Sequence, residues 1–493
     1  MRRILFAAAV CLFVGVAAAP AQAKAIYGTA RSELLVGTNK ADQITAEGGG
    51  VDRIKCLGGR DVITADPTDK VAADCEVVSL RVSHDPYRNS DSQHQTQVEP
   101  DSFSYGSTIV NTFQSGRYFD GGASNMGWAT STDGGKTWRS GSLPGVTQFS
   151  APPGLYPRAS DPTVAYDAVH GVWMIASLGF SPEANAMLIS RSGDGTSWDV
   201  PVTAIRSETD LDFDKEWIVC DNWASSPFRG NCYLTFADFG LGRLVTLTSH
   251  DGGVTWSEPV PSPAFDNDGS LNGSQPVVRP DGMLVIVYSG QTMLGETVST
   301  DGGATFTDAT PIVAQLFLNV PSMRASAFPS VEVDAAGTIY AAWNDCGRRR
   351  VCNGDDIVLS SSTDGLHWSA PIRVPTGGSQ ADHTYFTPGL AADPATSRHL
   401  GIAYYEMQPC GCRIDVGFIG TRDGGTTWSK PQRLSARPMR LSWIAATSLG
   451  LMTGDYISTS FAGGKPFPVF ALSSPPSGRS LREAMFVTTR GIG

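Results

Sequence analysis

Ser131-Thr-Asp133-Gly-Gly-Lys-Thr137-Trp138 is the stretch that decides the fold, because close copies of it recur along the chain. The other copies begin at Ser192, Ser249, Ser299, Ser362 and Thr421. Their aspartates follow one another at intervals of 50 to 63 residues: Asp133, Asp194, Asp251, Asp301, Asp364 and Asp423. A repeat of that length, centred on turn residues, predicts an all-β array of similar sheets.

Each copy contains the chemistry of a tight turn. Glycine accepts the positive φ angles that such a turn needs, and the aspartate can accept hydrogen bonds from backbone N–H groups a few residues on. The Trp or Phe that follows opens the next strand and can bury its ring beneath the turn. The copies at Asp194 and Asp364 are one residue shorter, so we expect tighter turns there.

The pattern S-x-D-x-G-x-T-W resembles the Asp-box, or BNR repeat, of sialidases and related β-propellers. The resemblance covers roughly residues 96–493. It implies an all-β fold: a seven-bladed Asp-box β-propeller of four-stranded blades, with six blades as the alternative count, preceded by a small β-roll-like segment. It also implies that the motif is scaffold, on the face opposite the binding site.

Four regions are predicted along the chain: a signal peptide (1–23), a β-roll-like segment (24–83), a linker (84–97) and the propeller (98–493). The first begins with Arg2-Arg3 and an apolar run, and ends in Ala21-Gln-Ala23. These features predict a secreted, extracellular protein without a transmembrane segment. The formal net charge of −11 argues against nucleic acid as a partner, and we expect a monomer.

Eight cysteines follow the predicted signal peptide, an even number that suits an oxidising compartment. Their spacing predicts four local disulfides: Cys56–Cys75, Cys220–Cys232, Cys346–Cys352 and Cys410–Cys412. Zinc binding is the competing interpretation, and a reduced Cys410–Cys412 pair is another.

The segment 24–83 repeats an Asp-x-Ile/Val pattern every 8 to 10 residues, as in Asp52-Arg-Ile54 and Asp61-Val-Ile63. It resembles, in degenerate form, the calcium-binding β-roll of RTX proteins. The resemblance implies possible Ca²⁺ binding by Asp52, Asp61 and Asp69; the alternative is that these acids face solvent. We also predict that residues 76–82 close the last blade as its outer strand, because an open sheet edge needs a partner.

Ligands of propellers bind at the channel mouth, which the first strand of each blade builds. The candidate binding residues there are Glu99, Asp101, Asp214, Gln275, His383 and Asp455. Converging carboxylates would raise some pKa values or recruit a cation. The alternative is that each acid caps the start of its own strand.

A sialidase needs arginines that bind the substrate carboxylate, a tyrosine nucleophile with a glutamate, and an aspartic acid/base. By analogy, the candidates are Arg117, Arg324, Arg440, Glu216, Tyr385 or Tyr456, and Asp161. The Phe/Tyr-Arg-Ile-Pro signature of that family is missing before the first motif.

Three functions are compatible with these observations. The first is binding of extracellular glycans or of a protein partner at the channel mouth. The second is an exo-sialidase or another glycoside hydrolase or lyase, and the third is a structural or assembly factor of the cell envelope. No cofactor is required by any of them, and Ca²⁺ is a possible ligand.

Overall fold

The computed structural model describes residues 22–208, 213–263, 271–290, 292–377, 383–478 and 480–492. These residues form β-strands together with one short 3-10 helix, η1 (Leu441–Trp443). No helix in this described part is long and apolar enough to cross a membrane. The predicted signal peptide lies, apart from its last two residues, outside the described residues.

The N-terminal part is a β-solenoid of about three turns, whose strands alternate between two parallel sheets. One sheet contains β1 (Ala25–Tyr27), β3 (Gln43–Ala46), β5 (Val62–Ala65) and β7 (Val77–Arg81). The other contains β2 (Leu34–Val36), β4 (Arg53–Lys55) and β6 (Lys70–Val71). Apolar side chains stack from coil to coil, as Ile44 pairs with Ile63, and give the solenoid a small core of its own.

Antiparallel sheets form the rest of the described chain. An eight-stranded sheet contains β8 (Gln97–Tyr105), β9 (Thr108–Arg117), β10 (Ala123–Ser131), β11 (Arg139–Ser142), β12 (Arg158–Asp167), β13 (Val172–Ser181), β14 (Ala184–Ser192) and β15 (Val202–Ser207). A four-stranded sheet follows, with β16 (Phe213–Cys220), β17 (Cys232–Asp238), β18 (Arg243–Ser249) and β19 (Val260–Pro261). The next contains β20 (Asn272–Val278), β21 (Leu284–Ser289), β22 (Met293–Ser299) and β23 (Thr310–Ala314).

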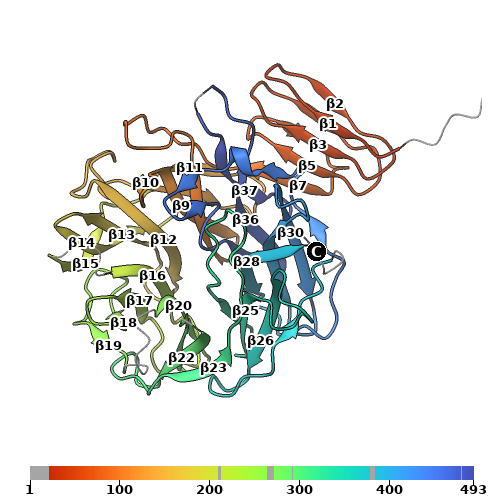
Figure 1. The fold of residues 1–493 in the computed structure, drawn as a ribbon. Helices are drawn as coiled ribbons and strands as arrows, with labels where there is room; N and C mark the ends of the chain where they lie inside the picture. Colours follow the sequence, from red (N-terminus) through yellow and green to blue (C-terminus); the bar gives the residue numbers. More distant parts are fainter. Residues whose placement is uncertain are drawn as a thin grey trace, which may run out of the picture.

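The C-terminal half continues in the same way. Its sheets contain β24 (Ser330–Val333), β25 (Ile339–Asp345), β26 (Asp356–Ser362) and β27 (Ile372–Arg373), then β28 (Thr384–Ala392), β29 (Leu400–Met407), β30 (Arg413–Thr421), β31 (Gln432–Arg433) and β32 (Met439–Arg440). A small hairpin, β33 (Ala446–Thr447) and β34 (Gly450–Leu451), precedes β35 (Ser458–Ala462), β36 (Lys465–Ser473) and β37 (Glu483–Thr488). The strands β8, β12, β16, β20, β24, β28 and β35 lie side by side around a common axis, and β35 also contacts β8 (Figure 1).

The predicted fold class is wrong in the form given above. It assumed four-stranded blades, the last of them closed by residues 76–82 of a small roll, whereas the structure contains a β-solenoid of about three turns whose sheet continues into the C-terminal strands. They share one seven-stranded sheet, ordered β1-β3-β5-β7-β37-β36-β35, and the first two predicted blades merge into one eight-stranded sheet. The physical reason is that each sheet edge carries unpaired N–H and C=O groups, and pairing one edge with another satisfies both.

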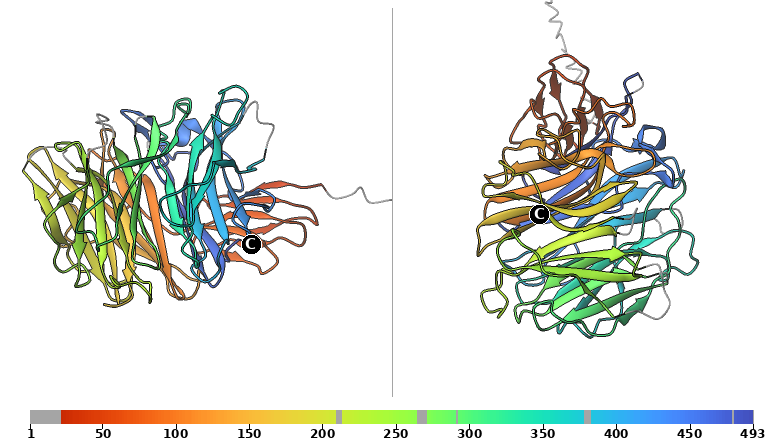
Figure 2. Two further views of the ribbon diagram at one scale, coloured as in Figure 1. Left: turned by 90° about the horizontal axis from the view of Figure 1, so that it is seen from below. Right: turned by 90° about the vertical axis from the view of Figure 1, so that its left-hand side faces the viewer.

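The junction between solenoid and antiparallel sheets is built from several contacts. Strand β7 pairs antiparallel with β37, and the Ser79 hydroxyl donates a hydrogen bond to the Leu434 carbonyl at 2.6 Å. The Arg490 guanidinium donates to the carbonyls of Cys75 at 2.6 Å and Ala72 at 2.9 Å. Figure 2 shows the solenoid projecting from the side of the sheets at this junction.

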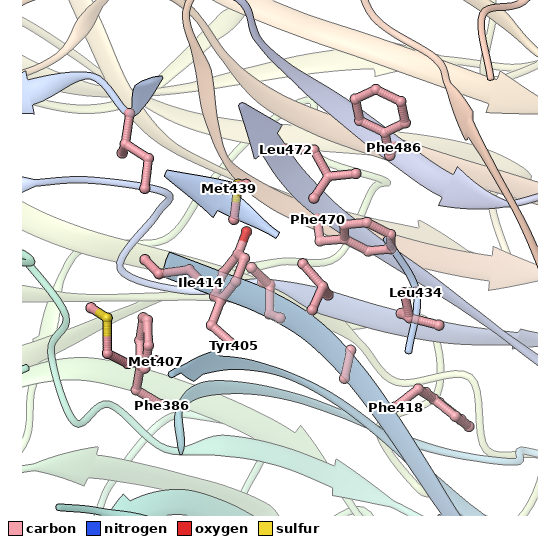
Figure 3. Close-up of a cluster of buried hydrophobic side chains, with 14 of the residues drawn as sticks. Phe386, Tyr405, Met407, Ile414, Phe418, Leu434, Met439, Phe470, Leu472 and Phe486 are labelled. Atoms are coloured by element: carbon pink, nitrogen blue, oxygen red, sulfur yellow. The ribbon is translucent and has the colours of Figure 1, made fainter. Parts of the chain in front are cut away.

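A buried cluster beside the junction fixes the last sheets in place. Phe386, Tyr405, Phe470 and Phe486 come from four strands and meet in one apolar core (Figure 3). Val77 of the solenoid belongs to the same cluster, so the solenoid shares a hydrophobic core with the antiparallel sheets. All four predicted disulfides are present: Cys56–Cys75, Cys220–Cys232, Cys346–Cys352 and Cys410–Cys412.

The repeated motif forms the expected turns. In the third copy, Asp251 Oδ1 accepts hydrogen bonds from the N–H groups of Val254 and Thr255, at 3.1 and 2.9 Å. The hydroxyl of Ser249 accepts a further bond, 2.8 Å long, from the Gly253 N–H. Strand β10 begins beside Arg117 and ends at the first copy of the motif. The motif turns and the Arg117 end therefore lie at opposite ends of that strand.

Candidate functional site

Five of the strands around the axis share a backbone irregularity near their first residues. The register between each of the strands β8, β12, β16, β20 and β28 and the strand that follows it shifts there by one extra residue, a β-bulge. The first residue of each shift has a positive φ: Glu99 at 54°, Asp161 at 49°, Lys215 at 51°, Gly273 at 62° and Thr387 at 48°. A residue other than glycine that adopts such a positive φ angle strains the backbone by about 1–3 kcal/mol, and strain of this kind clusters at functional sites.

Three of these strained residues meet in one buried ionic cluster. The ammonium group of Lys215 lies 3.0 Å from Glu99 Oε1 and 2.9 Å from Asp455 Oδ2, and it also donates a hydrogen bond to Asp161. An ammonium group has three donors, so each carboxylate receives one. All four residues are buried.

The charges in this cluster fix its protonation. Burial alone would lower the pKa of Lys215, but the charges of Asp161, Asp455 and Glu99 raise it well above its usual value. Burial would also raise the pKa of Asp455, yet Lys215 and Arg324 hold that pKa below its ordinary value. For Glu99 burial prevails, and its pKa rises to about 7. The cluster thus contains a permanent cation, a permanent anion and a carboxyl group that titrates near neutral pH.

Arg324 connects the cluster to the surface. Its Nε and Nη2 atoms donate to Asp455 Oδ1 and Oδ2 at 3.0 and 2.5 Å, the two-point geometry that orients a guanidinium plane. Burial would lower the pKa of Arg324, but the charge of Asp455 raises it, so this arginine remains charged. About a fifth of its side chain, 22%, is exposed.

A cleft of about 750 Å³ opens above the cluster. Arginines, carboxylates and aromatic rings line it: Arg117, Arg158, Arg324, Asp91, Asp120, Asp161, Asp214, Tyr118, Phe180, Phe213 and Phe239. Arg158 lies at 4.7 Å over the Tyr118 ring and donates to Asp120 at 2.8 Å. Arg117 is buried below, where its Nη1 donates to the Gly122 carbonyl at 3.0 Å. The lining therefore combines three arginines with four aspartates, and Arg158 and Arg324 are paired with Asp120 and Asp455.

The structure brings together several of the residues that the sequence predicted. Asp161, Asp214, Arg117 and Arg324 line the cleft, while Glu99 and Asp455 lie beneath it with Lys215. Asp214 accepts a hydrogen bond from Asn272 Nδ2 at 2.8 Å. Asp101 is more deeply placed: it accepts the Val164 N–H at 2.8 Å, and burial raises its pKa to about 7.

Other predicted residues line a small central cavity of about 20 Å³ below the cluster, namely Glu216, Gln275 and Tyr456. Both carboxyl oxygens of Glu216 lack a hydrogen-bond partner among the described residues, and burial raises its pKa well above the usual value. The Tyr456 hydroxyl donates to the Pro162 carbonyl at 3.1 Å, and the Gln275 side chain accepts the Val331 N–H at 2.8 Å.

Three predicted residues lie away from the cleft. Arg440 is exposed and sits 5.7 Å from the ring of Trp443. The hydroxyl of Tyr385 donates to the Gly377 carbonyl at 2.5 Å, and burial raises the pKa of Tyr385 to about 12. His383 Nδ1 lies 2.5 Å from Glu406 Oε1. The arginine that accompanies Arg117 and Arg324 is thus Arg158, not Arg440.

Lys215 and Arg158 are the residues that sequence reasoning missed. Lys215 stands between Asp214 and Glu216, both of which had been singled out, and a lysine flanked by acids is ordinarily expected at the surface. Arg158 precedes Asp161 by three residues. Its closeness to an acid predicted at the start of a strand was the signal available in the sequence.

In the solenoid, the predicted calcium ligands bind backbone instead. Asp61 accepts the Asp42 N–H at 2.7 Å and in turn donates its own N–H to Glu76 at 2.8 Å. The second series connects Asp52 to Asp69, again by an N–H to carboxylate bond of 2.8 Å. These carboxylate ladders join each coil to the next.

A calcium ion needs six to eight converging oxygens. Among the described residues, only Cys56, Asp74 and Cys75 bring three potential ligand atoms together. The two cysteines form a disulfide and cannot bind a metal. The ladders use Oδ1 of Asp61 and of Asp69, whereas Oδ2 of Asp52 and of Asp61 has no hydrogen-bond partner among the described residues.

No protein-family model and no curated protein matches the chain, so the resemblance to the Asp-box family is not confirmed. Among solved structures, an ulvan lyase is similar at 11% identity over 82% of this chain and 96% of that one, with a TM-score of 0.49. The arabinofuranosidase Arb93A of Fusarium graminearum has 14% identity over 70% of this chain and 97% of that one (TM-score 0.43).

The sialidase NanB of Streptococcus pneumoniae is similar at 13% identity over 82% of this chain and 69% of that one, with a TM-score of 0.41. All three neighbours are carbohydrate-active enzymes by name. At these identities and scores, the likenesses carry no argument about the chemistry of the cleft.

Proposed function

We propose that the protein binds an anionic extracellular glycan in the cleft above Lys215. The observation that carries the proposal is that Arg117, Arg158 and Arg324, from distant parts of the chain, line one cleft. Guanidinium groups bind carboxylates and sulfates by paired hydrogen bonds, and aromatic side chains such as Tyr118 and Phe239 offer flat apolar faces. The carboxylates between them are acceptors for sugar hydroxyls.

The ionic cluster gives this cleft a rigid floor. Asp455 is bound by both Lys215 and Arg324, so the guanidinium plane of Arg324 has its orientation before any ligand arrives. A binding group that is already ordered loses less conformational entropy when the ligand binds. The strained backbone at Glu99, Asp161 and Lys215 is explained in the same way, because it delivers three charged groups to one point.

Binding is favoured over sialoside hydrolysis by the position of the two candidate nucleophiles. Tyr385 donates its hydroxyl to the Gly377 carbonyl, and Tyr456 donates to the Pro162 carbonyl. A nucleophile must reach the reacting carbon, and neither tyrosine lines the cleft among the described residues.

Calorimetric titration with hyaluronan and chondroitin sulfate fragments tests the proposal. We expect Arg158→Ala to weaken binding by about 10- to 100-fold, the effect of losing one hydrogen-bonded charge. Arg422→Ala, which removes an exposed arginine of the last motif copy, is the matched control and should bind like the wild type. Absence of binding by the wild type, or equal affinity of Arg158→Ala, would overturn the proposal.

A further inference from the structure

The small central cavity below Lys215 lies where three β-bulges meet. In each of the strands β16, β20 and β28, the register with the following strand skips two residues. All six skipped residues line the cavity: Lys215, Glu216, Gly273, Ser274, Thr387 and Pro388. A bulge disrupts the ladder of hydrogen bonds locally. The wall of the cavity is therefore made of backbone segments at which three ladders are interrupted.

Buried polar atoms without a partner gather at this cavity. Both carboxyl oxygens of Glu216 and the hydroxyl oxygen of Thr387 have no hydrogen-bond partner among the described residues. Glu216 is 1% exposed and Thr387 is 2% exposed, so bulk water does not reach these groups. Buried polar groups are ordinarily paired, and an unpaired one is costly. The three atoms together indicate an occupant that binds oxygen.

The charge of Glu216 has no direct counter-ion in the described part of the chain. The ammonium group of Lys215 gives its three hydrogens to other carboxylates, those of Glu99, Asp161 and Asp455. The negative charges of Asp161 and Asp214 also act on Glu216, and the positive charge of Lys215 opposes them.

Two further titratable residues line the cavity, and both already have partners. The Asp455 carboxylate is bound by Lys215 and Arg324, and the Tyr456 hydroxyl donates to the Pro162 carbonyl. Neither of them supplies a positive charge to Glu216. A cationic occupant would therefore be attracted to this carboxylate.

The size and the donors of the cavity restrict the class of this occupant. A volume of about 20 Å³ admits one particle of the size of a water molecule. Mg²⁺ keeps several of its waters, for which there is no room, and Ca²⁺ prefers sites with several carboxylates. Alkali metal ions, by contrast, bind carbonyl oxygens of irregular backbone together with few charged groups. A water molecule would fit the volume but would leave the charge of Glu216 uncompensated.

We propose that this cavity binds one alkali metal cation, Na⁺ or K⁺, with the Glu216 carboxylate as its charged ligand and the Thr387 hydroxyl as a neutral ligand. The ion holds the bulged starts of β16, β20 and β28 together beneath the ionic cluster. This site is separate from the glycan-binding cleft and does not depend on the proposed function.

The test is thermal melting at pH 8 in choline chloride, NaCl and KCl, each at about 100 mM. We expect the wild type to melt about 1–2 °C higher in NaCl or KCl than in choline chloride, the effect of an ion present at about ten times its dissociation constant on a chain of this size. The salt that gives the larger shift identifies the ion. Glu216→Gln should melt at one temperature in all three salts, and Thr387→Val should show a smaller shift than the wild type. Glu258→Gln, at an exposed position, is the control and should respond like the wild type.

Two outcomes would overturn the proposal. If the wild type melts at the same temperature in all three salts, the cavity contains water or Glu216 carries a proton, and no metal ion binds. This comparison needs no substitution, so it is decisive even where a variant fails to fold. If Glu216→Gln keeps the full shift of the wild type, the ion acts elsewhere on the protein.

Discussion

The ammonium group of Lys215 is shared by three buried carboxylates, so its removal should be severe. We expect Lys215→Met to lower the free energy of unfolding by about 3–5 kcal/mol at pH 7.5, because it leaves buried charge without a partner. The loss should shrink at pH 5, where Glu99, whose pKa is already about 7, takes up a proton in the folded state. Urea unfolding at both pH values measures this effect.

Lys136→Met is the matched control, since Lys136 is exposed in the first motif copy. A Lys215→Met protein as stable as the wild type at pH 7.5 would contradict the cluster. A loss of unfolding free energy that grows toward pH 5 would also contradict the cluster, because protonation of the carboxylates should reduce that loss.

The raised pKa of Glu216 leads to a second prediction. Burial raises its pKa, so the folded state binds a proton more tightly than the unfolded chain, and stability falls as the pH rises above about 4.3. The slope is about 1.4 kcal/mol per pH unit until the pH reaches the folded pKa. Glu216→Gln cannot ionise, so its stability relative to the wild type should increase from pH 5 to pH 8.

The same substitution at Glu258, which is exposed, should leave the pH profile unchanged. Parallel stability profiles of wild type and Glu216→Gln would show that the Glu216 carboxyl group is solvated. Its lack of a hydrogen-bond partner in the central cavity would then have no energetic consequence.

At the scale of the element, the motif turns were predictable because their contacts are local. Asp251 accepts its hydrogen bonds from residues three and four positions later, and these bonds outweigh burial and lower its pKa to about 2. Asp251→Ala should destabilise the protein by about 1–2 kcal/mol at pH 7. Because the depressed pKa contributes stability only while the carboxylate is charged, the difference should disappear as the pH falls toward 2.

Thermal melting across that pH range measures the difference in stability between Asp251→Ala and the wild type. Asp199→Ala is the control, because Asp199 is exposed just after the second motif copy. A constant difference between Asp251→Ala and the wild type at all pH values would show that packing, and not the charged carboxylate, causes the loss.

The solenoid acids lead to a prediction about calcium. Asp61 and Asp69 accept backbone N–H groups of neighbouring coils, so the coils are joined without an ion. We expect EDTA, and added millimolar Ca²⁺, to leave the melting temperature unchanged, while Asp61→Ala lowers it. A rise in melting temperature with Ca²⁺ that Asp61→Ala abolishes would restore the calcium interpretation.

The candidate site shows what the sequence could not reveal. Glu99, Asp161 and Asp455 were predicted as acids near the axis because each stands at the start of a strand. Their shared partner, Lys215, is more than fifty residues away from each of them, and no local pattern connects them. Arg440 lies away from the cleft for the same reason: its position depends on the path of the chain between β30 and β33, not on its neighbours in sequence.

For the whole molecule, the sequence predicted strands and turns, but the predicted grouping of the strands into sheets was wrong. The motif marks each repeat, yet it does not say which sheet edges meet. In the structure, β7 of the solenoid pairs with β37, and β12 pairs with β10 through Ala159 and Ala123. The first contact lies where residues 76–82 were expected to close the last blade, and the second joins parts that the sequence treated as separate. An exposed edge is satisfied by whichever strand the fold brings beside it.

This continuity makes the solenoid part of the stability of the entire protein. Deletion of residues 24–83 would remove β7 from β37 and expose the apolar cluster of Phe486, to which Val77 belongs in the full chain. We expect a loss of at least about 3 kcal/mol in unfolding free energy, the effect of removing large buried side chains, together with aggregation through the open edge. Deletion of residues 24–38 is the control, since it removes β1 and β2 and leaves β7 in place. If the longer deletion melts at the wild-type temperature, the shared sheet contributes nothing to stability, and the solenoid is an independent unit.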